Sequence, residues 1–362
     1  AGDTLNIWAW TYYENIVISK ELTVIGNGTV NTIINGTFTN HAVKITEDKV
    51  KLSNIKIIAG GNSSNSKAGI YLESAAQVKI DNVAVSEGGY GIHCWGDSNY
   101  LRVSNSSISS NSLHGIYFNN YCYYSSIENN TINSNSGNGI NFQEGGRYSS
   151  LYNNTLKNND NGVRIVWTMD VAISHNTIKD NDKCGISVES VSIYVIKHNL
   201  VTGSGTRNIF LINTSEMVIS NNTVKDSLSD GIYIDSSDNV DLWNNTIEDS
   251  GESNSDIYVK DSSGNIFSIN NYFNSITVNS NSSLIVKEYF VLDVNDASGA
   301  NMSGIDIKVL ENTTQKYATS YFDGTDLKTD SSGTIATFLI NHKIYDGSST
   351  PTTIPIYVTA RN

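Results

Sequence analysis

Proline, cysteine and charge are all scarce in this sequence. Of its 362 residues, 2 are proline and 3 are cysteine, and charged residues make up 16%. The cysteines, Cys94, Cys122 and Cys184, lack the spacing of a zinc site, and their odd number excludes a complete set of disulfides. No apolar run approaches the roughly 18 residues that a membrane-spanning helix needs, so we expect no transmembrane segment.

Basic residues are also few. The 23 Lys and Arg residues are outnumbered by 36 Asp and Glu residues, which gives a net charge of −13. Because such a surface repels polyanions, nucleic acid and anionic lipid are disfavoured as partners.

What the sequence does contain is a repeat of about 23 residues between Gly91 and Ser253. Each copy opens with Gly-Ile or a close variant and closes with a variant of Asn-Asn-Thr-Ile. Subtracting successive opening positions gives spacings of 24, 24, 23, 23, 23 and 23 residues, so one structural unit is stacked on copies of itself. The openings are Gly91-Ile92, Gly115-Ile116, Gly139-Ile140, Gly162-Val163, Gly185-Ile186, Asn208-Ile209 and Gly231-Ile232.

Apolar residues recur in three columns of this repeat, which begin at Ile70, Ile80 and Val85. Nearly all are β-branched or Leu, as stiff, half-buried strand positions prefer. The Asn, Ser, Gly and Asp residues between them favour turns. The pattern therefore predicts an all-β fold, a parallel β-helix in which each strand pairs with its equivalent in the next rung about 4.8 Å away. In this register Cys94 points inward.

The Gly-Ile openings and Asn-Asn-Thr-Ile closings resemble the repeats of the pectin-lyase-like right-handed parallel β-helix proteins. They are closest to the NosD-like type that is abundant among secreted archaeal proteins. The run from Ala1 to Gly26 is similar to the entry coil of that family. The resemblance implies a right-handed β-helix of about ten rungs over residues 1–283. It says little about function, because this scaffold carries enzymes, adhesins and structural proteins.

Two domains are predicted. Residues 1–283 form the β-helix, with entry rungs at 1–39 and the most regular rungs at 91–253. From residue 284 the pattern changes to short alternating strands, at 290–294, 305–309, 334–338 and 354–358, separated by turns. Residues 284–362 therefore resemble a small immunoglobulin-like antiparallel β-sandwich.

A polar column follows the second apolar column at an interval of two residues. We expect its side chains to turn inward and to hydrogen-bond from rung to rung as a structural ladder, because buried amides need partners. The column consists of Asn82, Asn105, Asn129, Asn153, His175, His198, Asn221 and Asn244.

An aromatic column is predicted on the outer surface, two residues after each opening. Exposed aromatic rings along one face are typical of protein or sugar contact; the alternative is that they only shield the sheet, as cross-strand aromatic pairs do. The candidate binding residues are Tyr71, His93, Tyr117, Phe210, Tyr233 and Tyr258, with Trp95 alongside.

Residues for catalysis are sparse in this register. Glu189 and Asp235 lie two rungs apart, near the separation of an inverting glycosidase, but Ile212 lies between them. Arg164 and Asp170 share a rung and are the best lyase candidates. Since acids and bases do not converge on one patch, no catalytic residue is assigned, and the sequence favours a protein that is not an enzyme.

No metal site and no cofactor are predicted either. His175 and His198 occupy neighbouring positions that otherwise hold Asn, which favours a structural role over a metal site. Copper is the ion that the NosD-like resemblance suggests for this pair, and calcium is a candidate ion at Asp323, Asp326 and Asp330 in the C-terminal module.

Asn-X-Ser/Thr triplets are unusually frequent and favour a secreted glycoprotein. Those that start on the polar column should be inaccessible. The glycosylation candidates are Asn27, Asn35, Asn62, Asn213, Asn281, Asn301 and Asn312.

The first residue is Ala, so we expect that a leader has been removed and that the protein is extracellular or on the cell surface. Members of the resembled family place a capping helix ahead of this point. Three possibilities follow: the cap was lost from the chain, the first residues cover the end themselves, or the mature protein is uncapped and associates head to tail, since an open rung exposes unpaired strand edges.

The sequence therefore predicts a secreted structural or adhesive surface protein, self-associating into a filament or surface array such as an S-layer, or binding other surface proteins. The alternative is a carbohydrate-active β-helix enzyme, a lyase or glycoside hydrolase, or an extracellular glycan-binding protein.

Overall fold

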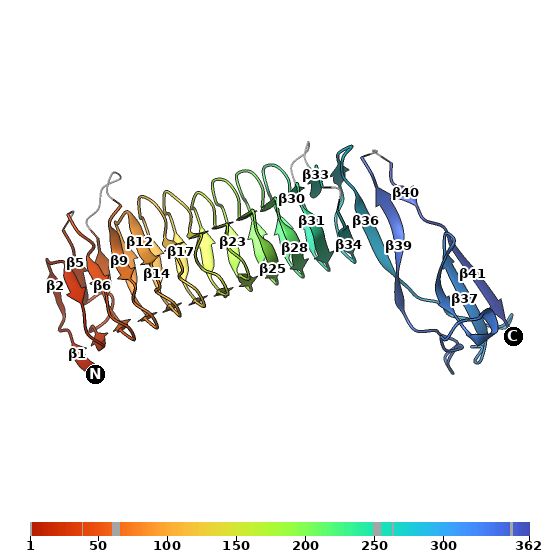
Figure 1. Ribbon diagram of the computed structural model, residues 1–362, viewed down its shortest axis with the longest axis horizontal. Coiled ribbons are helices and arrows are strands. Elements are labelled where there is room, and N and C mark those ends of the chain that lie inside the picture. Colours follow the sequence, from red (N-terminus) through yellow and green to blue (C-terminus); the bar gives the residue numbers. More distant parts are fainter. Residues whose placement is uncertain (1, 38, 60–65, 249–254, 263, 348–349) are drawn as a thin grey trace.

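The computed structural model describes residues 2–37, 39–59, 66–248, 255–262, 264–347 and 350–362. They form a rod whose rungs follow one another in sequence order, with the C-terminal strands at the far end (Figure 1). Each regular rung contributes one short strand to each of three sheets, in which the strands of neighbouring rungs pair in parallel. The sheets are named A, B and C here. Sheet B has 11 strands, in line with the predicted number of about ten rungs.

Sheet A is the longest and runs from the first rung into the C-terminal region. Its strands are β1 (Asp3–Asn6), β4 (Leu22–Ile25), β7 (Lys51–Ser53), β10 (Lys79–Asp81), β13 (Arg102–Ser104), β16 (Ser126–Glu128), β19 (Ser150–Tyr152), β22 (Ala172–Ser174), β25 (Ser192–Lys197), β28 (Ser215–Ser220), β31 (Asp238–Trp243), β34 (Ile266–Ile269), β36 (Leu284–Phe290), β39 (Phe338–Tyr345) and β40 (Thr352–Thr353).

Sheet B follows sheet A within each rung. Its strands are β2 (Trp10–Tyr12), β5 (Thr32–Asn35), β8 (Lys56–Ile58), β11 (Ala84–Ser86), β14 (Ser107–Ser109), β17 (Thr131–Asn133), β20 (Thr155–Lys157), β23 (Thr177–Lys179), β26 (Leu200–Thr202), β29 (Thr223–Lys225) and β32 (Thr246–Glu248).

Sheet C begins at the Gly-Ile openings and completes each rung. Its strands are β3 (Ile16–Ile18), β6 (Val43–Ile45), β9 (Ala68–Glu73), β12 (Tyr90–Trp95), β15 (Ile116–Asn119), β18 (Ile140–Gln143), β21 (Val163–Val166), β24 (Ile186–Glu189), β27 (Ile209–Ile212), β30 (Ile232–Asp235), β33 (Ile257–Lys260) and β35 (Ile276–Val278).

The three apolar columns fill the interior, as predicted. Ile92 pairs with Ile116 in register, and both are fully buried, as is the inward-pointing Cys94. The opening glycines are needed because successive backbones approach closely there. A Cβ at Gly115 would lie 2.5 Å from the carbonyl oxygen of Gly139, which is closer than non-bonded atoms approach.

The predicted inward polar column is wrong by one residue. All eight of its members are exposed. Each lies at the corner of the rung between sheets A and B and has a left-handed backbone, with φ between 50° and 59°, which turns the side chain outward. Asn suits this position because it tolerates the left-handed conformation. His175 and His198 follow the same rule and stack on one another outside, with ring centroids 4.9 Å apart.

The buried ladder is formed by the next residue of each rung. Asn130 donates to Asn154 Oδ1 through its main-chain N–H and its side-chain amide, each at 3.0 Å, and Asn154 Nδ2 donates to the carbonyl of Ile127 at 2.8 Å. The corner's polar groups are thereby satisfied without water. Its members are Asn130, Asn154, Asn176, Asn199, Asn222, Asn245 and Asn271.

The C-terminal region begins inside sheet A. β36 pairs in parallel with β34 and then antiparallel with β39. A separate three-stranded antiparallel sheet contains β38 (Thr314–Ala318), β37 (Asp306–Glu311) and β41 (Ile356–Arg361), and one short 3₁₀ helix, η1, spans Ser320–Phe322. The immunoglobulin-like nature of this region stays a prediction. Of the strand predicted at 290–294, Phe290 ends β36 and pairs with Phe338, and Asp293 forms a bridge with Thr334.

Candidate functional site

The predicted aromatic column lies on the outer face of sheet C, but it is packed rather than free. Tyr117 and Tyr233 are only 9% exposed, so the predicted exposure is wrong for them. Tyr71, His93, Phe210 and Tyr258 are half-buried, and only Trp95 is exposed. The rings fall into two groups, separated by Asn141, Arg164 and Ser187 in the same register.

The first group contains histidines as well as tyrosines. His93 lies between Tyr71 and Tyr117, with ring centroids 5.2 and 4.9 Å away, and His41, Tyr90 and His114 complete the cluster. Because each ring packs against the next, these residues shield the sheet, as the alternative interpretation of the column proposed.

These histidines are neutral near pH 7. Burial lowers the pKa of His41, His93 and His114 to about 4, and the positive charges of nearby Lys67 and Lys44 add to the effect at His41. His41 Nδ1 accepts the N–H of Ala68, and His114 Nδ1 accepts the N–H of Asn138, each at 3.0 Å.

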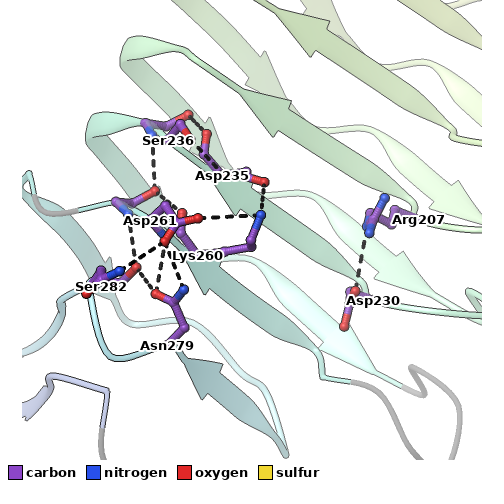
Figure 2. Close-up of polar contacts among 11 residues, drawn as sticks. Arg207, Asp230, Asp235, Ser236, Lys260, Asp261, Asn279 and Ser282 are labelled. Carbon is purple, nitrogen blue, oxygen red and sulfur yellow. Dashed lines mark hydrogen bonds and ion pairs between the residues drawn. The ribbon is translucent and has the colours of Figure 1, made fainter.

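The second group surrounds Arg207. Its guanidinium carbon lies 3.9 Å from the centroid of Tyr233 and 4.9 Å from that of Phe210, and Tyr258 stacks on the far side of Tyr233 at 4.9 Å. Arg207 also forms an ion pair with Asp230, whose Oδ2 lies 3.6 Å from the buried Nε, a distance too long for a hydrogen bond (Figure 2). This arginine is therefore positioned by aromatic stacking and by the carboxylate of Asp230.

A surface groove of about 610 Å³ lies beside Arg207, over β21, β24 and β27 and the turns that lead into sheet C. It is lined by three cations and two carboxylates, with amide, hydroxyl and aromatic side chains between them. Its lining includes Asn138, Asp160, Asn161, Arg164, Lys183, Cys184, Ser187, Glu189, Thr206, Arg207 and Phe210.

Both carboxylates that line the groove are ion-paired. Arg164 donates two hydrogen bonds to Glu189, at 3.0 and 3.1 Å, and Lys183 Nζ lies 3.0 Å from Asp160. Cys184 is buried among them, and burial raises the pKa of its thiol. Fixed, paired charges of this kind bind and orient a polar ligand better than they transfer protons.

Each carboxylate that the sequence put forward for catalysis is held by a cation. Glu189 is held by Arg164, and Asp235 binds Lys260 Nζ at 3.0 Å, which raises the pKa of that lysine (Figure 2). Asp170 faces Arg147, with Arg147 Nε 4.0 Å from Asp170 Oδ2, rather than Arg164.

Several groove residues were missed because the sequence search considered strand columns alone. Asn138, Asn161, Cys184 and Arg207 each lie immediately before an opening residue, in the turn between sheets B and C. If the residue before each opening had been aligned from rung to rung like the strand columns, the alignment would have shown an arginine, Arg207, beside the aromatic column.

The described residues contain no cluster of three or more His, Cys, Asp or Glu side chains that could hold a metal ion. Asp326 accepts the N–H of Ala318 at 2.7 Å, Asp330 accepts those of Ser332 and Thr334, and Asp323 ends η1 in a left-handed conformation. The calcium hypothesis therefore stays a prediction.

The glycosylation candidates lie on the surface where the structure describes them. Asn35 is half-buried and Asn62 lies outside the described residues, while the exposed candidates are Asn27, Asn213, Asn281, Asn301 and Asn312. The corner asparagines that begin sequons are exposed too, so their predicted inaccessibility is wrong.

Comparison with known proteins gives the class. The sequence matches the family described as right handed beta helix region over residues 22–178, 68–224 and 165–316, and the chain belongs to that family. No curated protein matches the chain as a relative. Among the helices of the described part, none is long and apolar enough to cross a membrane.

Solved structures with this fold include carbohydrate-active proteins. The A-module of the mannuronan C-5 epimerase AlgE4 from Azotobacter vinelandii has a TM-score of 0.65 at 17% identity, covering 78% of this chain and 88% of that one. The catalytic domain of Agl-KA has a TM-score of 0.63 at 15% identity, covering 78% of this chain and 62% of that one. The Dettilon tailspike protein has a TM-score of 0.56 at 14% identity, covering 94% of this chain and 70% of that one. At these identities the likeness shows the fold alone.

Proposed function

We propose that this chain is an extracellular carbohydrate-binding protein with an adhesive role, which holds a polysaccharide in the groove on sheet C. The observation that carries the proposal is the position of Arg207. Its guanidinium is stacked on Tyr233 at the groove, and its side chain is partly exposed there. A sugar carboxylate or hydroxyl would accept hydrogen bonds from its terminal nitrogens.

The cations of the groove favour an acidic sugar. Arg164, Lys183 and Arg207 gather at the groove in a chain whose net charge is −13, and each of them has one carboxylate partner, Glu189, Asp160 and Asp230 respectively. The likeness to an epimerase of mannuronan supports the choice of oligomannuronate as the first ligand to test.

Binding is favoured over catalysis. A glycoside hydrolase needs one carboxyl group that carries a proton and a second that is free to act as base or nucleophile. Here Glu189 and Asp160 are each held by a cation. The groove thus has recognition groups without an acid–base pair.

Calorimetric titration with oligomannuronates tests the proposal. The substitution Arg207→Ala should weaken binding about tenfold, because it removes a charge-assisted contact worth about 1.4 kcal/mol or more. Arg102→Ala, on sheet A, is the matched control and should bind like the wild type. If the wild type binds neither oligomannuronates nor neutral oligosaccharides, the proposal is wrong.

A second candidate function is assembly through the first rung, into a filament or array on a cell surface. The described first rung exposes large apolar side chains, with Trp8 83% exposed and Leu5, Trp10, Tyr13 and Val17 all more than half exposed. A second copy would bury them and pair the open strand edges. Negative-stain electron microscopy should then show rods joined end to end. Single rods at micromolar concentration would contradict assembly and favour a preceding segment of chain as the cover.

A further inference from the structure

A second aromatic surface lies on the edge of sheet C that is opposite the groove, in the turns that lead from sheet C to sheet A. Tyr100, Tyr124 and Tyr148 occupy the same position in three successive rungs, and all three are exposed. Trp95, the last residue of β12, and Trp167, which follows β21 one rung beyond Tyr148, are exposed as well, Trp167 by 60%. We call these five residues the aromatic ridge.

The backbone makes this ridge an unexpected place for aromatic rings. The three tyrosines have φ of 60°, 55° and 59°, and Trp167 has φ of 53°. Bulky residues adopt this left-handed conformation at a cost, and such strain persists where another constraint favours it. The position of the three tyrosines is occupied in other rungs by Lys49, Gln77, Asp170, Glu216 and Asn239, and that of Trp167 by small polar residues such as Ser190, Asn213 and Ser236.

The three tyrosines form a regular ladder along the rod. Successive ring centroids are 5.1 and 5.0 Å apart, with interplanar angles of 12° and 16°. Since the rings cover one another's faces, their exposed edges carry one hydroxyl group per rung. Trp95 and Trp167 stack on no other ring among the described residues.

Carboxylates outnumber cations in the turns that carry the ridge, where Asp97, Glu144 and Asp170 accompany Arg147, so an anionic ligand is disfavoured. Arg147 lies 4.8 Å from the ring of Tyr148, and its Nε is 4.0 Å from Asp170. A row of evenly spaced hydroxyls flanked by apolar rings therefore suits an uncharged ligand that repeats with a similar spacing. An extended β-1,4-linked glycan advances by a similar length per sugar and has both hydroxyl groups and apolar C–H faces.

We infer that the aromatic ridge binds an uncharged β-1,4-linked polysaccharide lying along the rod. The tyrosine hydroxyls hydrogen-bond successive sugars, and Trp95 and Trp167 stack on sugar faces. This rests on the proposed carbohydrate-binding function, but it assigns a surface and a ligand class separate from the groove.

Depletion assays with microcrystalline cellulose, chitin and insoluble β-mannan test the inference. The wild type should be retained on at least one of them. The triple substitution Tyr100→Asn, Tyr124→Asn and Tyr148→Asn, and separately Trp167→Ser, should reduce retention at least tenfold. Because Asn and Ser are the residues that such corners accept, both variants should melt no lower than the wild type, which separates lost binding from lost folding. Tyr152→Ser, an exposed tyrosine on sheet A, is the matched control and should be retained normally.

The outcomes separate the ridge from the groove. If no insoluble glycan retains the wild type, or if the ridge variants are retained equally, the ridge inference is overturned. If, in that case, oligomannuronate still binds in a manner that depends on Arg207, the ridge inference is wrong but the groove proposal stands. If the wild type binds neither oligomannuronate nor any of the other glycans, both proposals fall.

Discussion

Asn154 Oδ1 accepts two hydrogen bonds from a single residue, Asn130, one from its main-chain N–H and one from its side-chain amide. This arrangement repeats along the rod. The side-chain oxygen of each buried asparagine accepts hydrogen bonds from the asparagine of the rung before it, and its own N–H groups donate to the asparagine of the rung after it. The stability of the β-helix is thereby linked to an amide ladder as well as to its apolar columns.

Removing one member of the ladder should cost far more than removing its exposed neighbour. Asn176 accepts two hydrogen bonds from Asn154, and Asn176→Ala leaves both donors buried without an acceptor. We expect the free energy of unfolding to fall by about 3 kcal/mol, since each such group costs about 1–3 kcal/mol. Denaturant unfolding measures this.

His175→Asn is the matched control for that measurement. It changes the adjacent, exposed corner to the residue that most other rungs have there, so stability should stay the same or rise slightly. Equal losses in the two variants would contradict the assignment of the buried ladder.

Acid should destabilise the protein through the histidine cluster. Burial, with repulsion from His41 and His114, lowers the pKa of His93 from 6.5 to about 4. The unfolded chain therefore binds a proton at a higher pH than the folded chain does. The stability from neutral His93 is complete above pH 6.5 and is lost as the pH falls toward 4, by up to about 3 kcal/mol.

His93→Phe removes this titration without removing a hydrogen bond, because His93 Nε2 is buried without a partner among the described residues. Chemical denaturation at pH 7 and pH 4.5 should show a smaller loss of stability in the variant than in the wild type. Parallel losses would show that His93 does not titrate with unfolding.

The corner asparagines should accept glycan when the protein is made in a host that glycosylates Asn-X-Ser/Thr. Asn105, Asn129, Asn153, Asn221 and Asn244 are exposed, opposite to the prediction from the sequence. Glycopeptide mass spectrometry should therefore find glycan at some of these positions as well as at Asn213 or Asn281. Glycan confined to the latter two would mean that the corner geometry prevents modification.

The repeat predicted the fold because spacing alone sets the register. Gly115 and Gly139 recur where backbones touch, and the apolar columns follow at fixed intervals. The same spacing could not tell Asn129 from Asn130, since either amide of an Asn-Asn pair satisfies the pattern. The handedness of the corner, φ of 58° at Asn129, decides which one points inward, and periodicity does not contain it.

The groove could be predicted only in part for a related reason. Arg164 and Glu189 belong to strand columns, so the sequence identified both, but not that they bind each other across neighbouring rungs. Arg207 and Lys183 lie in the turn before sheet C. How close their side chains come to the strands of sheet C depends on the backbone path of that turn, and amino-acid composition does not determine that path.

The ion pair between Arg164 and Glu189 gives a test in which a substitution should strengthen binding. Glu189 accepts two hydrogen bonds from Arg164 and one from the hydroxyl of Ser187. Glu189→Gln removes the negative charge while keeping the size of the side chain. The guanidinium of Arg164 is then free to bind a sugar carboxylate, so the affinity for oligomannuronate should rise about tenfold at low salt.

Glu128→Gln, in the equivalent pair with Arg102 on sheet A, is the control and should leave affinity unchanged. The gain should shrink as salt rises, because screening weakens the contact between exposed charges. Unchanged or weaker binding by Glu189→Gln would place the ligand away from Arg164. A gain for neutral oligosaccharides of equal size would show that the groove reads shape and hydroxyl groups rather than carboxylate charge.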